Sequence, residues 1–137
     1  MVERELVLRK LAELELYLRQ VSEFREITVE RYREDWKVQR IVERTLQMAF
    51  ETCADVANHV IADRKLEVPS TYAETFEVLD RAGLLEHELA KVMIRIAGFR
   101  NVLVHEYTNV DGQIVVRILQ NHLADLERFR DAARAWV

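Results

Sequence analysis

The sequence predicts an all-α fold, an up-and-down bundle of about five helices. Half of the 137 residues are hydrophobic, which is enough for one core. Glycine and proline, the residues that interrupt helices, number only three and one. Apolar residues also recur every three to five positions over long stretches, which is the period of an amphipathic helix. We therefore expect residues 1–137 to form a single helical domain.

The first two predicted helices lie before Pro69. One runs from Glu3 to about Phe24, and the next begins near Thr28 and continues without a breaker to about Leu66. The second would be roughly 55 Å long, so it must bend, break or protrude. Some of its apolar residues lie off the main apolar stripe, and we expect a partner subunit to cover them: Leu46, Phe50 and Ala54.

Three further helices are predicted after Pro69. Ser70 is expected to cap the third helix, which ends before Gly83. The fourth helix spans Leu84 to about Glu106, and Asp111 caps the fifth. The expected inward positions of the fifth helix are Ile114, Ile118, His122, Leu126 and Phe129.

Composition limits the environment of the protein. Cys53 is the only cysteine, so the chain forms no internal disulfide, which suits a reducing compartment. The N-terminus has no signal-peptide pattern and no apolar run is long enough to span a membrane, so we expect a cytoplasmic protein without a membrane partner. The net charge of -4 argues against a broad grip on nucleic acid but leaves room for a local basic cleft.

Four polar residues cluster near the end of the fourth helix: Arg100, Asn101, His105 and Tyr107. At 100° per residue, Asn101 and His105 are neighbours on the helix surface, so the amide can hydrogen-bond the imidazole. A purely structural alternative is that Arg100 and His105 pair with Glu106 or with an acidic residue of another helix. Buried ionisable groups cost desolvation, so a cluster of four favours a functional site.

The remaining candidate residues are interpreted as structural. His59 is the best candidate for a second polar group in the cleft, His87 is expected to be solvated, and His122 to pack in the core or an interface. No histidine pair has metal-ligand spacing, so we expect no metal site and no cofactor. Cys53 is interpreted as a packing residue rather than a nucleophile.

The segment Arg100 to His105 and Tyr107 resembles the signature of HepT-like toxins of the HEPN superfamily: Arg, four residues beginning with Asn, His, any residue, Tyr. The stretches 35–44, 55–61 and 69–76 are also similar to that family. The resemblance implies a HEPN-like helical dimer and the toxin component of a toxin–antitoxin system.

The resemblance also implies a metal-independent endoribonuclease. Arg100 and His105 would be the catalytic residues, Asn101 would support them, and two subunits would bring their sites together across a dimer cleft. The 2'-hydroxyl of RNA is the internal nucleophile, so histidine serves as base and arginine stabilises the charged phosphorane. The expected substrate is RNA, either mRNA or tRNA, and DNA is not cleaved.

The same family implies a switch at Tyr107. A cognate MntA-like minimal nucleotidyltransferase, the antitoxin, attaches AMP to this tyrosine and places negative charge beside Arg100. The alternative function is a non-catalytic HEPN bundle that docks a nucleotidyltransferase or senses a nucleotide, with Arg100 holding a phosphate.

Overall fold

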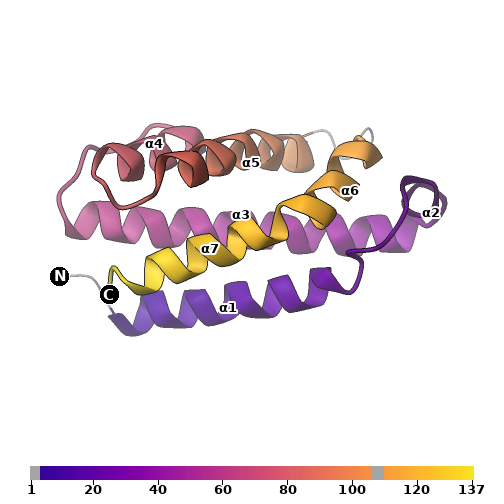
Figure 1. The fold of residues 1–137 in the computed structure, drawn as a ribbon, viewed down its shortest axis with the longest axis horizontal. Helices are drawn as coiled ribbons and strands as arrows, with labels where there is room; N and C mark the ends of the chain where they lie inside the picture. The colour runs from indigo at the N-terminus through magenta and orange to yellow at the C-terminus, as the bar shows by residue number, and fades with distance from the viewer. Residues whose placement is uncertain (1–3, 106–109) are drawn as a thin grey trace.

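The computed structural model describes residues 4–105 and 110–137, without the side chains of residues 104 and 105. These residues form seven helices and no strand, which confirms the predicted all-helical fold. In chain order the helices are α1 Arg4–Ser22, α2 Val29–Glu34, α3 Trp36–Asp63, α4 Tyr72–Arg81, α5 His87–His105, α6 Gly112–Asn121 and α7 Leu123–Arg134 (Figure 1).

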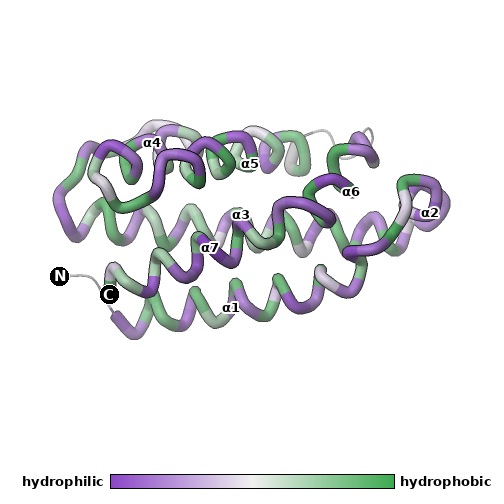
Figure 2. The backbone as a smooth tube through the Cα atoms, in the orientation of Figure 1, coloured by the Kyte–Doolittle hydropathy of each residue, from purple (hydrophilic) through white to green (hydrophobic). Residues whose placement is uncertain are grey.

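Helix α3 is the central element of the bundle. It packs against α1 on one side and against α4 and α5 on the other, and α7 lies along α1 (Figure 1). The short helices α2 and α6 contact each other at the end of the bundle where α3 begins. Hydrophobic and hydrophilic residues alternate along each long helix with the period of a helix, so each helix turns an apolar side to its neighbours (Figure 2).

The predicted second helix is interrupted at Asp35, and a break is one of the three outcomes that its length led us to expect. Thr28 caps α2, as expected, by accepting a hydrogen bond from the backbone N–H of Arg31 at 3.1 Å. Asp35 leaves the helical conformation, and its carboxylate accepts the backbone N–H groups of Lys37 and Val38 at 3.0 and 3.2 Å. The side chain thus begins α3 by satisfying donors that have no partner within the helix.

The predicted fifth helix is also divided, into α6 and α7, at His122. Asp111 caps α6 as expected, since its carboxylate accepts the backbone N–H of Gln113 at 2.9 Å. His122 closes α6 with φ -117° and ψ -2°, and its Nδ1 lies 3.0 Å from a carboxylate oxygen of Asp125. Ile114, which was expected to point inward, is instead 38% exposed.

The cap of α4 is displaced by one residue from the prediction. Thr71, not Ser70, caps the helix by accepting the backbone N–H of Glu74 at 3.1 Å. The carboxylate of Glu74 in turn accepts the backbone N–H of Ser70 at 2.7 Å. Gly83, at φ +74°, follows the end of α4, and α5 begins at His87, slightly later than expected.

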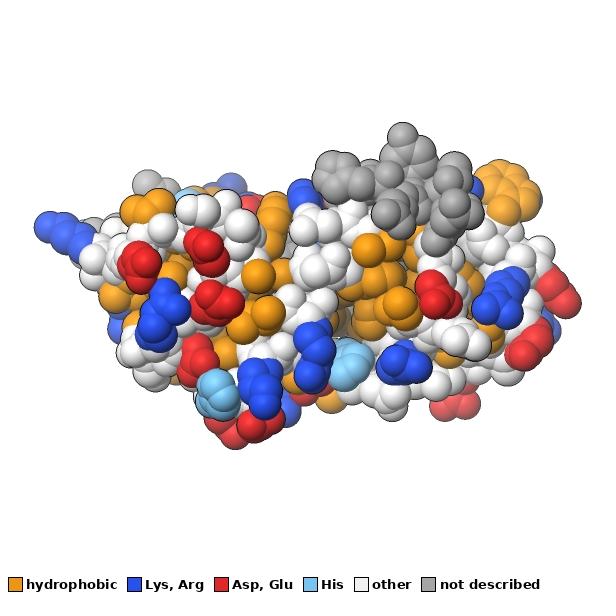
Figure 3. Space-filling model, turned by 90° about the horizontal axis from the view of Figure 1, so that it is seen from above, with side chains coloured by type: hydrophobic (Ala, Val, Ile, Leu, Met, Phe, Trp, Pro, Cys, Tyr) orange, Lys and Arg blue, Asp and Glu red, His pale blue; other side chains and the backbone are white. Residues whose placement is uncertain are grey.

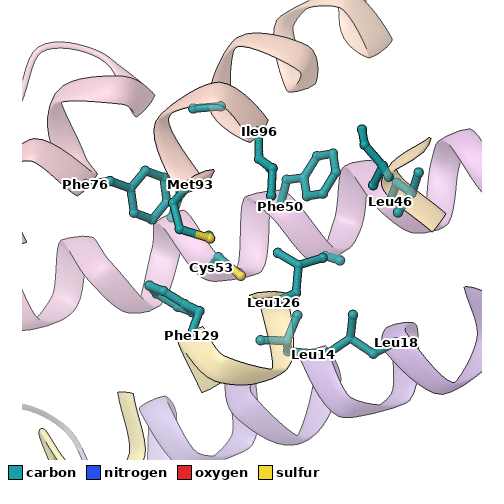
Figure 4. Close-up of a cluster of buried hydrophobic side chains, with 14 of the residues drawn as sticks. Leu14, Leu18, Leu46, Phe50, Cys53, Phe76, Met93, Ile96, Leu126 and Phe129 are labelled. Atoms are coloured by element: carbon teal, nitrogen blue, oxygen red, sulfur yellow. The ribbon is translucent and has the colours of Figure 1, made fainter. Parts of the chain in front are cut away.

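The hydrophobic core is formed by the helices of this one chain. Leu46, Phe50 and Ala54 of α3 are all buried in it, so they need no partner subunit and that part of the prediction was wrong. Figure 4 shows Leu46 and Phe50 of α3 among side chains from α1, α5 and α7. The ring of Phe129 makes edge contacts with two other aromatic rings at centroid distances of 5.9 and 5.7 Å.

Across the described residues, none of the helices combines the length and the apolar character that crossing a bilayer requires.

Candidate active site

Arg100, near the end of α5, reaches across to α3 and α4. Its Nη2 donates a hydrogen bond to Oε1 of Glu51 on α3 at 3.0 Å. Its Nη1 donates a longer one to Oδ1 of Asn101 at 3.3 Å. The guanidinium carbon lies 4.3 Å from the ring centre of Tyr72, at the start of α4, which is a cation–π contact. Three different groups therefore fix the orientation of the guanidinium.

The carboxylate that holds Arg100 is itself held in place. Gln47, one turn earlier on α3, donates a hydrogen bond from Nε2 to the same Oε1 of Glu51 at 3.1 Å. The side chains of Arg100 and Glu51 are 18% and 31% exposed, so the pair lies at the surface of the bundle rather than in its core. This pairing is the structural alternative considered for Arg100, an ion pair with an acidic residue of another helix.

The ion pair leaves part of the arginine fork available. A guanidinium has five N–H groups, and the two hydrogen bonds to Glu51 and Asn101 use two of them. The buried Nε of Arg100 has no hydrogen-bond partner among the described residues. A positioned, permanently charged group with unused N–H donors is suited to binding phosphate oxygens.

The structure describes the backbone of His105 but not its side chain, and it does not describe Tyr107. His105 is the last residue of α5, five positions after Arg100, and its imidazole lies outside the described residues. Tyr107 also lies outside them. The predicted Asn101–His105 hydrogen bond therefore stays a prediction, whereas the Asn101 side chain is seen to accept a hydrogen bond from Arg100.

Sequence reasoning missed the residues that surround Arg100. Glu51, Gln47 and Tyr72 were not identified as residues of the site. A signal for Glu51 was present, since this carboxylate lies within a stretch of α3 that is otherwise mostly buried, from Thr45 to Ala57. Its partner, 49 positions later, could not be deduced without the packing of α3 against α5.

The other histidines lie apart from Arg100. His59, half-buried, lines a shallow hollow of about 300 Å³ with Asp55, Asn58 and Ala62. His87 is 69% exposed, in agreement with the expected solvation, although its Nδ1 also lies 2.7 Å from a carboxylate oxygen of an α4 residue. Within the ranges 4–105 and 110–137, no group of three or more histidine, cysteine, aspartate or glutamate side chains is arranged to hold a metal ion.

Cys53 is fully buried, as expected for a packing residue, and burial raises the pKa of its thiol well above the usual range. A thiol that stays protonated is a poor nucleophile. Figure 4 shows its sulfur within the cluster of apolar side chains between α3, α5 and α7.

An apolar hollow lies on another side of α5. It has a volume of about 240 Å³ and is formed between α5 and α6, with two arginines and a histidine among its apolar lining residues: Val92, Arg95, Ile96, Phe99, Ile114, Arg117, Ile118 and His122. Figure 3 shows apolar side chains exposed between basic ones on the side of the molecule that carries α4, α5 and α6. Helix α5 therefore presents an arginine site and an apolar surface in different directions.

Comparison with known proteins gives consistent matches over most of the chain. A family model described as Ribonuclease HepT-like matches residues 14–133. The mRNA nuclease HepT of Shewanella oneidensis is 33% identical over 104 residues, which are 76% of this chain and 78% of that protein. The tRNA nuclease HepT of Aphanizomenon flos-aquae is 34% identical over 95 residues, covering 69% and 65% of the two chains. Among solved structures, the tri-AMPylated Shewanella oneidensis HEPN toxin in complex with MNT antitoxin superposes with a TM-score of 0.87 at 27% identity, covering 98% of this chain and 99% of that one.

Proposed function

Because the chain belongs to the ribonuclease HepT-like family, which confirms the resemblance noted in the sequence, we propose that it is a toxin that cleaves RNA through Arg100 and His105. Its relatives are named as mRNA and tRNA nucleases. The observation that carries the proposal is the anchored guanidinium of Arg100, held by Glu51, Asn101 and Tyr72 with N–H groups to spare.

The proposed reaction uses the nucleophile that RNA contains. His105 takes the proton of the 2'-hydroxyl as that oxygen attacks the adjacent phosphorus, and the bond from phosphorus to the 5'-oxygen breaks. The departing 5'-oxygen takes a proton from solvent water, and the remaining strand ends in a 2',3'-cyclic phosphate, or in the product of its hydrolysis by water. Arg100 stabilises the extra negative charge of the phosphorane, and Asn101 helps to hold Arg100. No metal ion takes part in this scheme.

The test is cleavage of total RNA and purified tRNA by the protein in excess chelator. We expect activity in the wild type and losses of 10²-fold or more in Arg100→Ala and in His105→Ala. Arg95→Ala is the matched control, since Arg95 is an exposed arginine on the same helix with no ion pair recorded among the described residues. Strict dependence on added Mg²⁺ or Mn²⁺, or full activity in the Arg100 and His105 variants, would contradict the proposal.

A composite site between two copies of the chain is the second part of the proposal. Gly98 lies on the exposed side of α5, and a Cβ added there would meet no atom within 4 Å. A glycine inside a helix costs about 0.5–1 kcal/mol relative to alanine. Since there is room for a Cβ at this position, packing within this chain does not explain why the residue is glycine. Gly98 and His105 are seven positions apart and share a helix face. Close approach of a second α5 at Gly98 would bring the His105 positions of the two subunits toward each other.

The dimer is tested by placing a large side chain at Gly98, where the two helices are proposed to meet. We expect Gly98→Trp to shift the protein from dimer to monomer in sedimentation velocity and to reduce RNA cleavage, with helical circular dichroism retained. Ala124→Trp, an exposed site on α7, is the control and should leave the dimer intact. A wild-type monomer that cleaves RNA at full rate would refute the composite site.

Tyr107 is the proposed site of inactivation. The solved relative is a tri-AMPylated toxin in complex with its antitoxin. Phosphodiester groups on Tyr107, seven positions after Arg100 in the sequence, would compete with the RNA phosphate for the guanidinium. Mass spectrometry after coexpression with a cognate MntA-like nucleotidyltransferase should find AMP on Tyr107, and Tyr107→Phe should stay toxic. A silenced protein without modified Tyr107 would refute this switch.

Growth assays separate the enzyme from a docking module. Expression of the wild type alone should arrest growth, and expression of His105→Ala should not. Equal behaviour of the two would favour the non-catalytic alternative, in which Arg100 only holds a phosphate.

A further inference from the structure

The N-terminal half of α3 carries a row of exposed basic residues. Lys37, Arg40 and Arg44 are three and four positions apart, so at 100° per residue they fall within about 60° of one another on the helix surface. Lys37 and Arg44 have no acidic partner among the described residues. Arg40 forms an ion pair with Glu43, in which its Nη1 lies 3.5 Å from Oε1 of the carboxylate. We name this row, together with Trp36, the α3 ridge.

The α3 ridge leads directly to the candidate active site. Gln47 and Glu51 follow Arg44 on the same side of α3, and Glu51 contacts Arg100. The distance along the helix from Lys37 to Glu51 is about 21 Å at 1.5 Å per residue. Figure 1 shows that α3 begins well beyond the end of α5, so this half of the helix is not covered by α5.

The ridge is locally positive although the whole chain carries a net charge of -4. Glu43, beside the ridge, accepts a hydrogen bond from the buried hydroxyl of Tyr32 at 2.5 Å with one carboxylate oxygen and pairs with Arg40 at 3.5 Å with the other, so its charge is shared and leaves Lys37 and Arg44 uncompensated by it. Cations in a row on one helix attract a polyanion locally, and the total charge does not decide this.

Trp36 adds an exposed aromatic surface at the outer end of the ridge. Its side chain is 64% exposed, which is unusual for a large apolar residue, and the Nζ of Lys37 lies 5.9 Å from its ring centre. An aromatic face beside backbone-binding cations is how proteins hold unpaired nucleotides, since every base has a π-face. A paired base offers no free face, so the combination favours a single strand.

We propose that the α3 ridge binds the single-stranded RNA that flanks the cleaved bond, with Lys37, Arg40 and Arg44 on successive backbone phosphates and Trp36 stacked on a base. This inference rests on the proposed function and adds the substrate class, an unpaired strand that extends several nucleotides from Arg100. An RNA too short to extend beyond Arg100 would not contact the ridge, so the ridge would not raise its affinity.

The test compares the cleavage of a long substrate with that of a short one by the purified protein. Kinetics are measured on a 12-nucleotide unstructured RNA and on a trinucleotide, for the wild type and for the triple variant K37A/R40A/R44A. We expect kcat/KM on the 12-mer to fall about 10- to 100-fold and kcat/KM on the trinucleotide to stay unchanged. The slope of log affinity against log salt, measured with the 12-mer on an inactive His105→Ala background, should fall by about 2, since each single-strand contact contributes about 0.7.

Two further variants sharpen the test. Trp36→Ala should weaken 12-mer binding about 5- to 100-fold without changing the salt slope, because stacking releases no counterions. The triple variant R9A/R19A/R128A removes the same charge from exposed sites on α1 and α7 and should leave both substrates unaffected.

The outcomes separate the two proposals. A wild-type protein that cuts neither RNA refutes the nuclease itself, whereas a wild type that cuts the 12-mer and a ridge variant with an unchanged KM refute only the ridge. Equal losses in the α1/α7 control, or equal losses on the trinucleotide, would also overturn it. If the wild type cuts the 12-mer but not the trinucleotide, cleavage requires contacts to the flanking nucleotides. A raised KM of the ridge variant on the 12-mer then assigns these contacts to the ridge, and an unchanged KM assigns them elsewhere. Loss of antitoxin binding with unchanged RNA kinetics would assign the ridge to a protein partner and overturn the inference.

Discussion

Removal of Glu51 tests whether the geometry around Arg100 matters for catalysis. Glu51 makes the shortest polar contact of Arg100, at 3.0 Å, and the contact to Asn101 is longer, at 3.3 Å. In Glu51→Ala the guanidinium keeps only the Asn101 contact and the ring of Tyr72. The side chain then becomes free to leave the position it needs for the transition state.

The expected size of the effect follows from these contacts. A hydrogen bond between charged groups is worth roughly 1.5–3 kcal/mol and the cation–π contact about 0.5–1 kcal/mol, so Glu51 supplies the largest restraint. Exposure of the pair reduces its value to about 1 kcal/mol or less in the stability of the fold. Loss of orientation should lower kcat about 10-fold, which corresponds to about 1.4 kcal/mol. KM should not rise, because a negative charge beside the RNA phosphate has been removed.

The assay is steady-state cleavage of a fluorescent RNA by Glu51→Ala and Glu51→Gln. Glu51→Gln keeps an oxygen that can accept the N–H of Arg100, so it should recover most of kcat. Glu67→Gln is the matched control, since Glu67 pairs with Arg81 at the same 3.0 Å on an exposed surface. Unchanged kcat in Glu51→Ala, or a rise in KM with kcat intact, would refute the positioning role of Glu51.

Three further predictions concern the fold. Phe129→Ala should lower the free energy of unfolding in urea by about 3–5 kcal/mol, because the side chain is fully buried between aromatic rings, and a loss below 1 kcal/mol would contradict that packing. Cys53 should react with Ellman's reagent at pH 8 only after unfolding, since burial keeps its thiol protonated; rapid reaction in the native protein would be inconsistent with the core. Burial and Glu43 raise the pKa of Tyr32, so its contribution to stability is complete below the pKa of an unfolded tyrosine, about 10, and is lost as the pH rises above it. Tyr32→Phe should therefore be about 1–2 kcal/mol less stable at pH 7 and lose less stability above pH 10; an equal alkaline loss in both proteins would argue against the shift.

The sequence predicts the long helices well because apolar periodicity reports directly on burial. The buried residues of α1 recur with the helical period that predicted this helix, and Asp111 caps α6 as expected. The positions of Pro69 and Gly83 predicted the helix ends between α3 and α5 to within a few residues. These features depend on local chemistry, which a single sequence contains.

The two helix breaks whose positions were not predicted occur at residues that do not forbid a helix. Asp35 ends one helix and begins the next by capping backbone N–H groups, a local alternative to the helical hydrogen bond that aspartate offers but does not require. His122 divides α6 from α7 although apolar spacing continues across it. The reason is tertiary: α6 buries Val115, Val116 and Leu119 besides the expected Ile118, and leaves Ile114 exposed.

The candidate site was predicted in part. Arg100 and Asn101 were identified from the polar cluster and the family signature, and the structure places their side chains in contact. Glu51 could not be assigned to the site, because its relation to Arg100 arises only when α3 and α5 pack together. The ridge on α3 was likewise not noticed, since its meaning depends on where Arg100 lies.

The most direct test of the account follows the 2'-hydroxyl. Two oligonucleotides of the same sequence, one entirely RNA and one with a single 2'-deoxy sugar at the cleaved position, are treated with the protein in excess chelator, and the product ends are identified by mass spectrometry. The account predicts that the RNA is cut to a 2',3'-cyclic phosphate or its hydrolysis product and that the substituted strand is intact at that position. Equal cleavage of both strands would contradict a mechanism in which His105 activates the 2'-hydroxyl and Arg100 stabilises the phosphorane.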